Sequence, residues 1–342
     1  MMKIFRFMLF PIMPIYYFVT WLRNKLYDLG IKKSVSYGFP VICVGNLSTG
    51  GTGKTPMIEY LIHLLKADYK VATLSRGYKR KTKGFQLADK NATAETIGDE
   101  PFQFYSKFRN EILVAVDANR CDGIQSLLHE NPEVILLDDA YQHRKVKAGF
   151  NILLTTYNNP YFNDLVLPTG NLREPKGGAI RANIIMVTKC PNDLSDNEKS
   201  KYIKRIHPEK HQHVFFSSIS YSDCLCSAEE TKAIDKLESF TLVTGIANSK
   251  PLVDFLRSEN LNFEHLNFKD HHDFTEEDIS EIFDNKLKGR DLTTNEVDKY
   301  RSFLFIYLGK KYHEYNWVQQ YHLGPIRNNN SRLMDQVGLD AG

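Results

Sequence analysis

A glycine-rich loop between an apolar run and a helical pattern most constrains how this chain can fold. The loop is Ser48–Thr55, with the sequence Ser-Thr-Gly-Gly-Thr-Gly-Lys-Thr. Residues 39–44 before it are continuously apolar, as in a buried strand, and residues 56–65 after it have the apolar spacing of a helix. In such a strand–loop–helix unit, backbone N–H groups and the helix N-terminus bind phosphate. The sequence therefore predicts a nucleotide-phosphate site.

The residues of this loop predict what each part of it binds. We expect Lys54 to reach the β- and γ-phosphate oxygens, and the Thr55 hydroxyl to ligate Mg²⁺. Thr49 stands where dimeric deviant Walker ATPases carry a second lysine, so such an ATPase is disfavoured and a kinase acting on a bound acceptor is favoured. The residues expected to contact the nucleotide are Ser48, Thr49, Gly50, Gly51, Thr52, Gly53, Lys54 and Thr55.

Further apolar runs predict a sheet around this unit. They are separated by helical or loop segments and lie at residues 69–74, 111–116, 133–137, 151–155 and 184–188. Continuously apolar strands are typical of a parallel sheet covered by helices on both faces. We therefore expect an α/β fold, with a P-loop NTPase-type, mostly parallel sheet and flanking helices over residues 34–235. A smaller C-terminal α/β domain, residues 236–342, is expected to close over the nucleotide site.

Composition narrows the partners and the compartment. The chain has 342 residues, and its 44 basic and 41 acidic residues give a net charge of +3. This balance gives no reason to expect a nucleic-acid partner. The cysteines number five, and Cys224 and Cys226 lack a second pair at zinc-ligand spacing. Together these features favour a reducing, cytosol-facing location without structural zinc.

The N-terminus departs from the pattern of a plain soluble protein. Residues 7–22 carry no charge, whereas basic residues stand on both sides of them. The run is shorter than the roughly 20 apolar residues of a spanning helix, and it contains Pro11 and Pro14. Its aromatic residues, Trp21 among them, suit the headgroup region of an anionic leaflet. We expect residues 1–33 to form a monotopic, membrane-associated helix, the alternative being a helix buried in the core.

Carboxylates follow one of the predicted strands. Asp138 and Asp139 come directly after residues 133–137, in the position of a Walker B strand end. Such a carboxylate can hold Mg²⁺ directly or through water, opposite Thr55. The sequence leaves open which of the two contacts the metal. Residues 98–101 are predicted to form a loop carrying two more carboxylates, and we count one of them, Glu100, among the magnesium ligands.

Taken in order, the motifs of this chain resemble the tetraacyldisaccharide 4'-kinase family, the lipid A 4'-kinases of Gram-negative bacteria. The resemblance covers roughly residues 1 to 275, and Ala140 departs from it because the family usually has glycine there. The motifs that carry it are Gly45–Pro56, Leu74–Tyr78, Gly98–Pro101, Asp138–His143, Leu167–Glu174, Thr244–Ala247 and Phe268–His272.

The resemblance implies transfer of the ATP γ-phosphate, with Mg²⁺, to the 4'-hydroxyl of a tetraacylated glucosamine disaccharide 1-phosphate. The product would be lipid IVA, made for lipopolysaccharide at the cytoplasmic face of the inner membrane. An acceptor held in a bilayer agrees with the N-terminal helix. An acceptor that already carries a phosphate agrees with arginines at strand ends, namely Arg76, Arg120 and Arg173. The residues implied to line the sugar and phosphate site are Asn46, Tyr78, Gln142, His143, Arg173 and Glu174.

The resemblance also implies that the loop with Asp99 lies over the γ-phosphate. We expect Asp99, assisted by His271, to accept the proton of the acceptor hydroxyl, with His272 the less favoured partner. Two other functions stay open: a P-loop synthetase or kinase acting on a soluble metabolite, and a membrane-recruited regulatory NTPase without an acceptor. The first would make residues 7–22 a core helix, and the second would hydrolyse nucleotide without an acceptor.

Overall fold

The computed structural model describes residue 6 and residues 8–226, 231–237, 239–246, 248–269 and 275. The chain divides into two compact units, Met1–Tyr221 and Ser222–Gly342. This division falls earlier than the boundary predicted after residue 235. The reason is that β9 (Cys224–Cys226) pairs with β10 (Thr231–Ala233) in a separate antiparallel sheet and not with the main sheet of the first unit.

The first unit is built on an eight-stranded sheet with the order β3-β4-β2-β5-β1-β6-β7-β8. Every pair in it is parallel except β3–β4, so the predicted α/β fold with a mostly parallel sheet is confirmed. The strands are β1 (Val41–Asn46), β2 (Val71–Ser75), β3 (Gln86–Leu87), β4 (Leu113–Val116), β5 (Val134–Asp138), β6 (Phe150–Thr156), β7 (Ile184–Cys190) and β8 (His213–Ser218).

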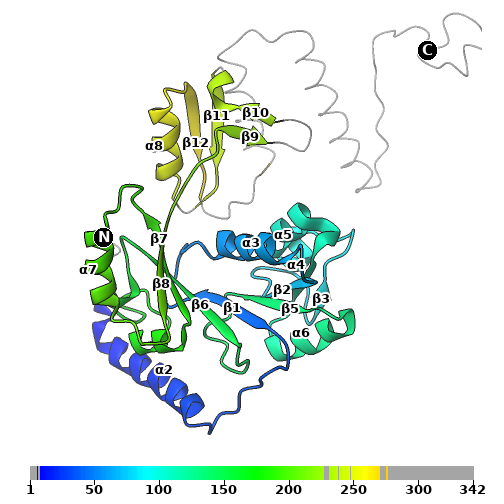
Figure 1. The fold of residues 1–342 in the computed structure, drawn as a ribbon, viewed down its shortest axis with the longest axis vertical. Helices are drawn as coiled ribbons and strands as arrows, with labels where there is room; N and C mark the ends of the chain where they lie inside the picture. Colours follow the sequence, from blue (N-terminus) through cyan, green and yellow to red (C-terminus); the bar gives the residue numbers. More distant parts are fainter. Residues whose placement is uncertain are drawn as a thin grey trace, which may run out of the picture. The chain divides into compact units, whose positions relative to one another are not determined.

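Helices cover both faces of this sheet (Figure 1). On one side lie α3 and α5, and on the other lie α2 and α6. The α-helices are α2 (Met13–Asp28), α3 (Lys54–Leu65), α4 (Ala94–Ile97), α5 (Asp99–Phe108), α6 (Arg120–Leu127) and α7 (Asp196–Ile206). Short 3₁₀ turns are η1 (Phe10–Ile12), η2 (Arg109–Glu111), η3 (Leu128–Glu130), η4 (Tyr161–Asn163) and η5 (Lys176–Arg181).

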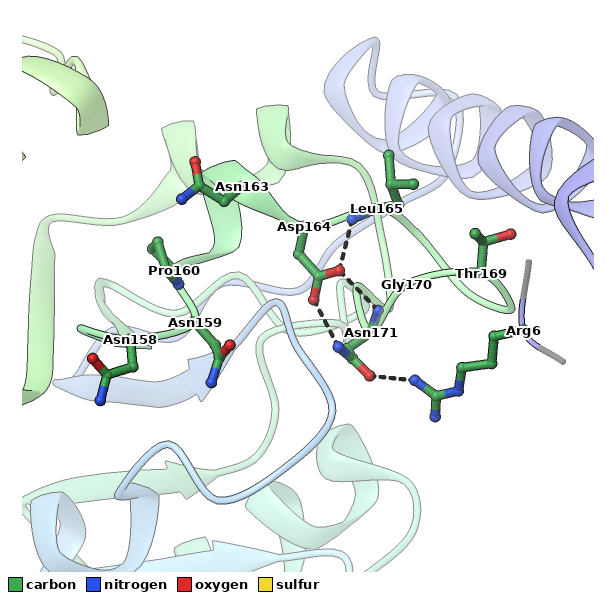
Figure 2. Close-up of a pocket in the computed structure, with 10 residues that line it drawn as sticks. All are labelled: Arg6, Asn158, Asn159, Pro160, Asn163, Asp164, Leu165, Thr169, Gly170 and Asn171. Atoms are coloured by element: carbon green, nitrogen blue, oxygen red, sulfur yellow. Dashed lines mark hydrogen bonds between the residues drawn. The ribbon is translucent and has the colours of Figure 1, made fainter. Parts of the chain in front are cut away.

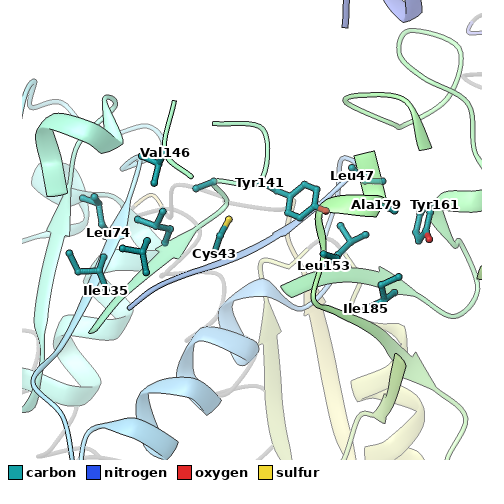
Figure 3. Close-up of a cluster of buried hydrophobic side chains, with 14 of the residues drawn as sticks. Cys43, Leu47, Leu74, Ile135, Tyr141, Val146, Leu153, Tyr161, Ala179 and Ile185 are labelled. Atoms are coloured by element: carbon teal, nitrogen blue, oxygen red, sulfur yellow. The ribbon is translucent and has the colours of Figure 1, made fainter. Parts of the chain in front are cut away.

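The hydrophobic core consists of two clusters, one on each face of the sheet. In one, Ile58 and Ile62 of α3 and Phe104 of α5 pack against the strands. The other contains Cys43 and Leu153 and extends to residues between the strands (Figure 3). Because the central strands are apolar on both sides, they are fixed between the helix layers. This arrangement brings the carboxyl ends of β1, β2 and β5 to one edge of the sheet.

The prediction of a loop at residues 98–101 was wrong. Asp99 and Glu100 form the first turn of α5, directly after Gly98. Gly98 has φ 93°, and a Cβ there would lie 3.0 Å from the backbone oxygen of Tyr78, so only glycine fits between the two segments. Helix α4 ends at this glycine and α5 begins after it. Both carboxylates therefore lie where the helix dipole favours negative charge.

Helix α2 follows the N-terminal turn η1 and is part of the first unit. Its large apolar side chains lie largely exposed along one side; they are Ile15, Tyr17, Phe18, Val19, Trp21 and Leu22. Among the described residues, no helix has both the length and the apolar character needed to cross a membrane.

The described part of the second unit contains a small parallel pair of strands. They are β11 (Phe240–Thr244) and β12 (Phe263–Asn267), connected by α8 (Lys250–Ser258), with the turn η6 (Ile234–Lys236) before them. The connection by a helix is what a parallel pair requires. The α/β character expected of this region is confirmed for these residues.

Candidate active site

The phosphate loop connects β1 to α3, as the sequence predicted. The strand ends at Asn46 and the helix begins at Lys54. Gly50 and Gly53 have φ values of 113° and 89°, a region that glycine adopts without strain. Gly53 immediately precedes α3, and no side chain caps the helix there. The first backbone N–H groups of the helix, which have no partner within the helix, therefore remain available to a ligand in the loop. This N-terminus and loop form a site for phosphate.

Neighbouring strand ends hold the loop in place. The Asn46 side chain donates to the Thr52 hydroxyl at 2.8 Å. At the end of β7, the Thr188 hydroxyl donates to the Thr52 carbonyl at 2.9 Å, and Lys189 Nζ donates to the Gly51 carbonyl at 2.7 Å. Asn46 is fully buried, so its donor supports the loop. Thr188 and Lys189 were not anticipated, because nothing in their local sequence indicates contact with this loop.

Asp139 lies between two cations. Arg173 Nη1 donates to both of its carboxylate oxygens at 2.9 Å, and Lys54 Nζ lies 3.7 Å from Oδ1. Burial alone would raise the pKa of Asp139, but the charges of Lys54 and Arg173 and the Arg173 hydrogen bonds lower it below its usual value. Asp139 is therefore a stable anion that holds Lys54 at the loop.

Asp138, next to it, has the opposite environment. It is 2% exposed, and its Oδ1 has no hydrogen-bond partner among the described residues. Burial, together with the charges of Glu100 and Asp139, raises the pKa of Asp138 to about 7. Lys54 and Arg120 offset this rise only in part, so a buried carboxylate oxygen without a donor is suited to a further cation.

The surroundings of Asp138 fit Mg²⁺ in particular. The described residues hold no cluster of three or more His, Cys, Asp or Glu side chains arranged for a metal ion. Magnesium does not need one, because it keeps several waters and takes one or two carboxylates plus substrate phosphates. The groups that could hold it here are the Asp138 carboxylate and the Thr55 hydroxyl, with Asp139 and Glu100 close enough to act on Asp138 electrostatically.

The structure separates the three arginines expected at the acceptor phosphate. Arg120 is 3% exposed and donates to the carbonyls of Asp117 and Asp138 at 3.1 and 3.2 Å. It therefore joins the carboxyl ends of β4 and β5 inside the protein. Arg173 is engaged with Asp139. Arg76 follows β2 and is exposed. Of these three side chains, Arg76 is exposed, Arg173 is 29% exposed beside Asp139, and Arg120 is buried.

Glu174 organises the neighbouring loops. It is 2% exposed and accepts hydrogen bonds from Arg181 at 2.7 Å, from Gln142 at 3.1 Å and from Asn24 of α2. Gln142 also donates to the Asn46 carbonyl at 2.8 Å. The remaining oxygens of Gln142 and Asn24 are buried without a partner among the described residues. Two buried acceptor atoms beside Glu174 are thus without a donor among the described residues, which is uncommon for buried polar atoms.

His143 adds a neutral group to this area. Burial, followed by the positive charges of Arg120 and Lys145, lowers the pKa of His143 to about 4. The imidazole is therefore uncharged at neutral pH. Its buried Nε2 has no hydrogen-bond partner in the part of the chain that the structure describes. A neutral imidazole suits a sugar hydroxyl better than a phosphate, because it offers no positive charge.

Helix α2 contacts these loops with its polar side. The Tyr16 hydroxyl donates to the Arg173 carbonyl at 2.9 Å, and Arg23 donates to the Gln142 carbonyl at 2.8 Å. Near the end of the helix, Asp28 pairs with Arg144 at 2.8 Å. The sequence predicted a membrane-associated helix here but not these contacts, since they join residues far apart in the chain.

The remaining predicted residues lie nearby or outside the described part. Tyr78 is exposed in the segment that packs against Gly98. Asp99 is exposed in the first turn of α5, beside Glu100. His271 lies outside the described residues, so its pairing with Asp99 stays a prediction.

The fold and this site define a P-loop nucleotide-binding protein with a Walker B strand end. The family described as "Tetraacyldisaccharide-1-P 4'-kinase" matches residues 5–326, and the chain belongs to this family. A tetraacyldisaccharide 4'-kinase of Flavobacterium johnsoniae is 53% identical over 304 residues, which cover 88% of each chain. One of Phocaeicola vulgatus is 45% identical over 306 residues, covering 86% of this chain and 83% of the relative.

A solved structure agrees with this assignment. The crystal structure of LpxK from Aquifex aeolicus, in complex with ATP, is 32% identical and superimposes with a TM-score of 0.65. The match covers 79% of this chain and 85% of the Aquifex chain. The resemblance noted from the sequence motifs is therefore confirmed.

Proposed function

We propose that this protein is a tetraacyldisaccharide 4'-kinase, which transfers the γ-phosphoryl group of ATP to the 4'-hydroxyl of a tetraacylated glucosamine disaccharide 1-phosphate to give lipid IVA. The observation that carries the proposal is the meeting of Lys54, Asp138 and Asp139 at the carboxyl ends of β1 and β5, in a chain of this family. The ATP bound to the Aquifex relative supports ATP as the donor.

The phosphate loop and Lys54 bind and orient the donor. Its N–H groups and the α3 N-terminus attract the phosphates, and Lys54, oriented by Asp139, balances charge on the transferred group. Mg²⁺, held by Asp138 and Thr55 with Asp139 and Glu100 nearby, would neutralise the charge that develops on the β- and γ-oxygens. Arg173 keeps Asp139 ionised and in place.

The acceptor hydroxyl needs a group that accepts its proton. Asp99 is our candidate, because Asp138 and Asp139 are committed to the cations and Asp99 is exposed next to Glu100 in the first turn of α5. His271 would orient Asp99 and adjust its basicity. Gln142 and His143 each have a buried polar atom without a partner among the described residues, and a small shift of their loop would expose these atoms to hydroxyl or amide groups of the sugar.

Membrane attachment explains the exposed apolar side of α2. Large side chains such as Ile15, Phe18 and Val19 are exposed on the helix whose other side contacts the loops of the site. Their burial in lipid would bring a bilayer acceptor to these loops. We propose peripheral, monotopic attachment at the cytoplasmic face of the inner membrane.

The activity is tested by incubating the purified protein with labelled ATP and a tetraacylated disaccharide 1-phosphate in detergent micelles. We expect Mg²⁺-dependent appearance of label on the lipid at the 4'-position, and no label with Lys54→Ala. Hydrolysis of ATP that does not depend on the acceptor would support a regulatory NTPase instead. Transfer to soluble sugars but not to the lipid would support a soluble-metabolite kinase.

A further inference from the structure

A cavity of about 360 Å³, lined by polar and apolar residues, lies beside the phosphate loop (Figure 2). Its wall is the segment from Asn158 to Asn171, and Arg6 contributes from the N-terminus. The backbone N–H of Thr49 donates to the Asn171 carbonyl at 2.8 Å, and Ser48 pairs with Leu172. The cavity is therefore attached to the first residues of the phosphate loop, whereas Lys54 lies at the loop's other end.

The guanidinium of Arg6 is held here by a neutral group. Its Nη1 donates to Asn171 Oδ1 at 2.7 Å, and Asn171 Nδ2 in turn donates to Asp164 Oδ2 at 2.9 Å. The other Asp164 oxygen accepts the backbone N–H groups of Leu165 and Asn171, at 2.8 and 3.3 Å. Asp164 therefore accepts hydrogen bonds from its own segment, and the contacts given for Arg6 do not include the Asp164 carboxylate.

Arg6 is consequently a positioned cation whose charge is not balanced. None of the ion pairs within the described residues includes it. An arginine carries five N–H donors, and one of them is used on Asn171. A planar guanidinium with free donors at the edge of a cavity is suited to a phosphate, which it can bind through two parallel hydrogen bonds.

Apart from Arg6 and Asp164, the residues that line the cavity are uncharged, and they include the apolar Pro160 and Leu165. Asn158 and Asn159 present exposed amides, which both donate and accept hydrogen bonds. Thr169 is 8% exposed, and its buried hydroxyl oxygen, which has no hydrogen-bond partner among the residues that the structure describes, lies behind this wall. Exposed amides of this kind match the hydroxyl groups of a sugar. Together with Arg6 they match a sugar that carries one phosphate.

We propose that this cavity binds the 1-phosphate end of the acceptor, with Arg6 as the counter-ion of the phosphate. This inference rests on the proposed function. The 1-phosphate and the 4'-hydroxyl lie at opposite ends of a disaccharide, so the phosphate needs a cation away from the reacting group. Arg120 is buried against carbonyls, and the charge of the partly exposed Arg173 is already balanced by Asp139, so Arg6 is the better placed cation.

The position of Arg6 along the chain agrees with a lipid substrate. It directly precedes the apolar N-terminal segment, where Met8, Phe10 and Ile12 are exposed. A phosphate bound at Arg6 would leave the acyl chains of the same molecule next to apolar side chains. Exposed Arg76, which follows β2, is the competing cation for this phosphate.

The test compares Arg6→Gln with the wild type on two acceptors, the disaccharide 1-phosphate and the same lipid without its 1-phosphate, in neutral detergent. We expect kcat/KM for the phosphorylated acceptor to fall about tenfold or more, mainly through KM, which corresponds to about 1.4 kcal/mol. The value for the dephosphorylated acceptor and the KM for ATP should not change. Arg6→Lys should recover part of the loss, because it keeps the charge.

Arg205→Gln is the matched control. Arg205 donates to Asn163 of the same segment at 2.8 Å, so its loss perturbs the segment without removing the proposed counter-ion. It should not distinguish the two acceptors. An equal loss on both acceptors in Arg6→Gln would contradict the proposal, and so would selectivity for the phosphorylated acceptor that depends on Arg76 and not on Arg6.

Binding measured without ATP separates this proposal from the proposed function. Each acceptor is titrated against the wild type and Arg6→Gln in the same micelles. Tighter binding of the 1-phosphorylated lipid that is lost in Arg6→Gln supports the subsite even where no transfer occurs. Transfer by the wild type without any such difference keeps the kinase assignment and overturns the subsite.

Discussion

At the scale of single residues, the site depends on two adjacent carboxylates with different surroundings. Asp139 is ionised by Lys54 and Arg173, whereas Asp138 is buried and its pKa is raised. Neighbouring carboxylates whose pKa values are driven apart are typical of sites that divide two roles between them. Here Asp139 orients the cations of the protein, and Asp138 is left for a cation that arrives with the nucleotide.

We predict that Asp138→Asn stabilises the nucleotide-free protein at pH 8. The pKa of Asp138 rises from 3.8 to about 7 on folding, so the unfolded chain loses this proton first as the pH increases. The free energy of unfolding of the wild type therefore falls as the pH rises from about 4 to about 7. Asparagine stays neutral at every pH, so the variant avoids this loss. The gain should be about 4 kcal/mol at most at pH 8 and should vanish near pH 4. Urea unfolding in a chelator at both pH values measures it.

Asp139→Asn is the control for this prediction. It removes a charge that Lys54 and Arg173 stabilise, so it should lower stability at pH 8. Mg²⁺-ATP should raise the melting temperature of the wild type but much less that of Asp138→Asn. Equal stability of Asp138→Asn and the wild type at pH 8 would mean that Asp138 is already balanced by a group of the protein.

At the scale of secondary structure, α2 has two different sides. The apolar side is exposed, with Phe18 and Trp21 stacked at 6.0 Å between ring centroids. The polar side is hydrogen-bonded to the loops of the site through Tyr16, Arg23 and Asn24. A helix that only anchored the protein would not need these contacts. Removal of the whole helix would disturb the site, so single substitutions are the better test of each side.

We predict that Phe18→Ser with Trp21→Ser weakens binding to lipid vesicles. Full burial of a large apolar side chain contributes roughly 1.5–3 kcal/mol, so partial burial of two should account for a tenfold or greater change in partition. Vesicle co-sedimentation measures this change. Tyr60→Ser with Leu64→Ser removes equally exposed side chains from α3 and should leave binding as it is. Equal losses in both pairs would contradict the role of α2.

We predict that Asn24→Ala lowers kcat without weakening vesicle binding. Asn24 donates to buried Glu174, which also holds Gln142, so its loss leaves a buried carboxylate with fewer donors and frees the Gln142 loop. The cost should be about 1–2 kcal/mol of stability, together with a lower kcat. Thr20→Ala is the control, because the Thr20 hydroxyl bonds only within its own helix. Unchanged kcat in Asn24→Ala would restrict α2 to anchoring.

The elements differ in how well the sequence predicts them, for physical reasons. The central strands are buried on both faces, so their apolar runs are continuous and could be recognised. Helix α7 and edge strand β8 bury few side chains, and neither was predicted. The phosphate loop and the aspartates after β5 are local motifs and could be predicted. Arg6 and Asn171 are separated by 165 positions, and no local pattern joins them.

At the scale of the whole molecule, the proposed chemistry uses residues from both units. Asp99 belongs to the first unit, and His271 lies within the sequence range of the second, outside the described residues. The pairing of Asp99 with His271 therefore stays a prediction, and variants of the two residues test it.

We predict that Asp99→Ala and His271→Ala each lower kcat strongly, by about a hundredfold or more, whereas ATP affinity changes little. General bases contribute roughly 10²–10⁴-fold to a rate, and the phosphate loop, not this pair, binds the nucleotide. If His271 acts through Asp99, the double variant should lose little more than Asp99→Ala alone, since residues that act as one unit are not additive. His272→Ala should retain most of the activity.

Single-turnover transfer to the lipid acceptor at saturating ATP measures these rates. Losses that multiply in the double variant would show that the two residues act independently, and near-normal turnover in Asp99→Ala would require another base.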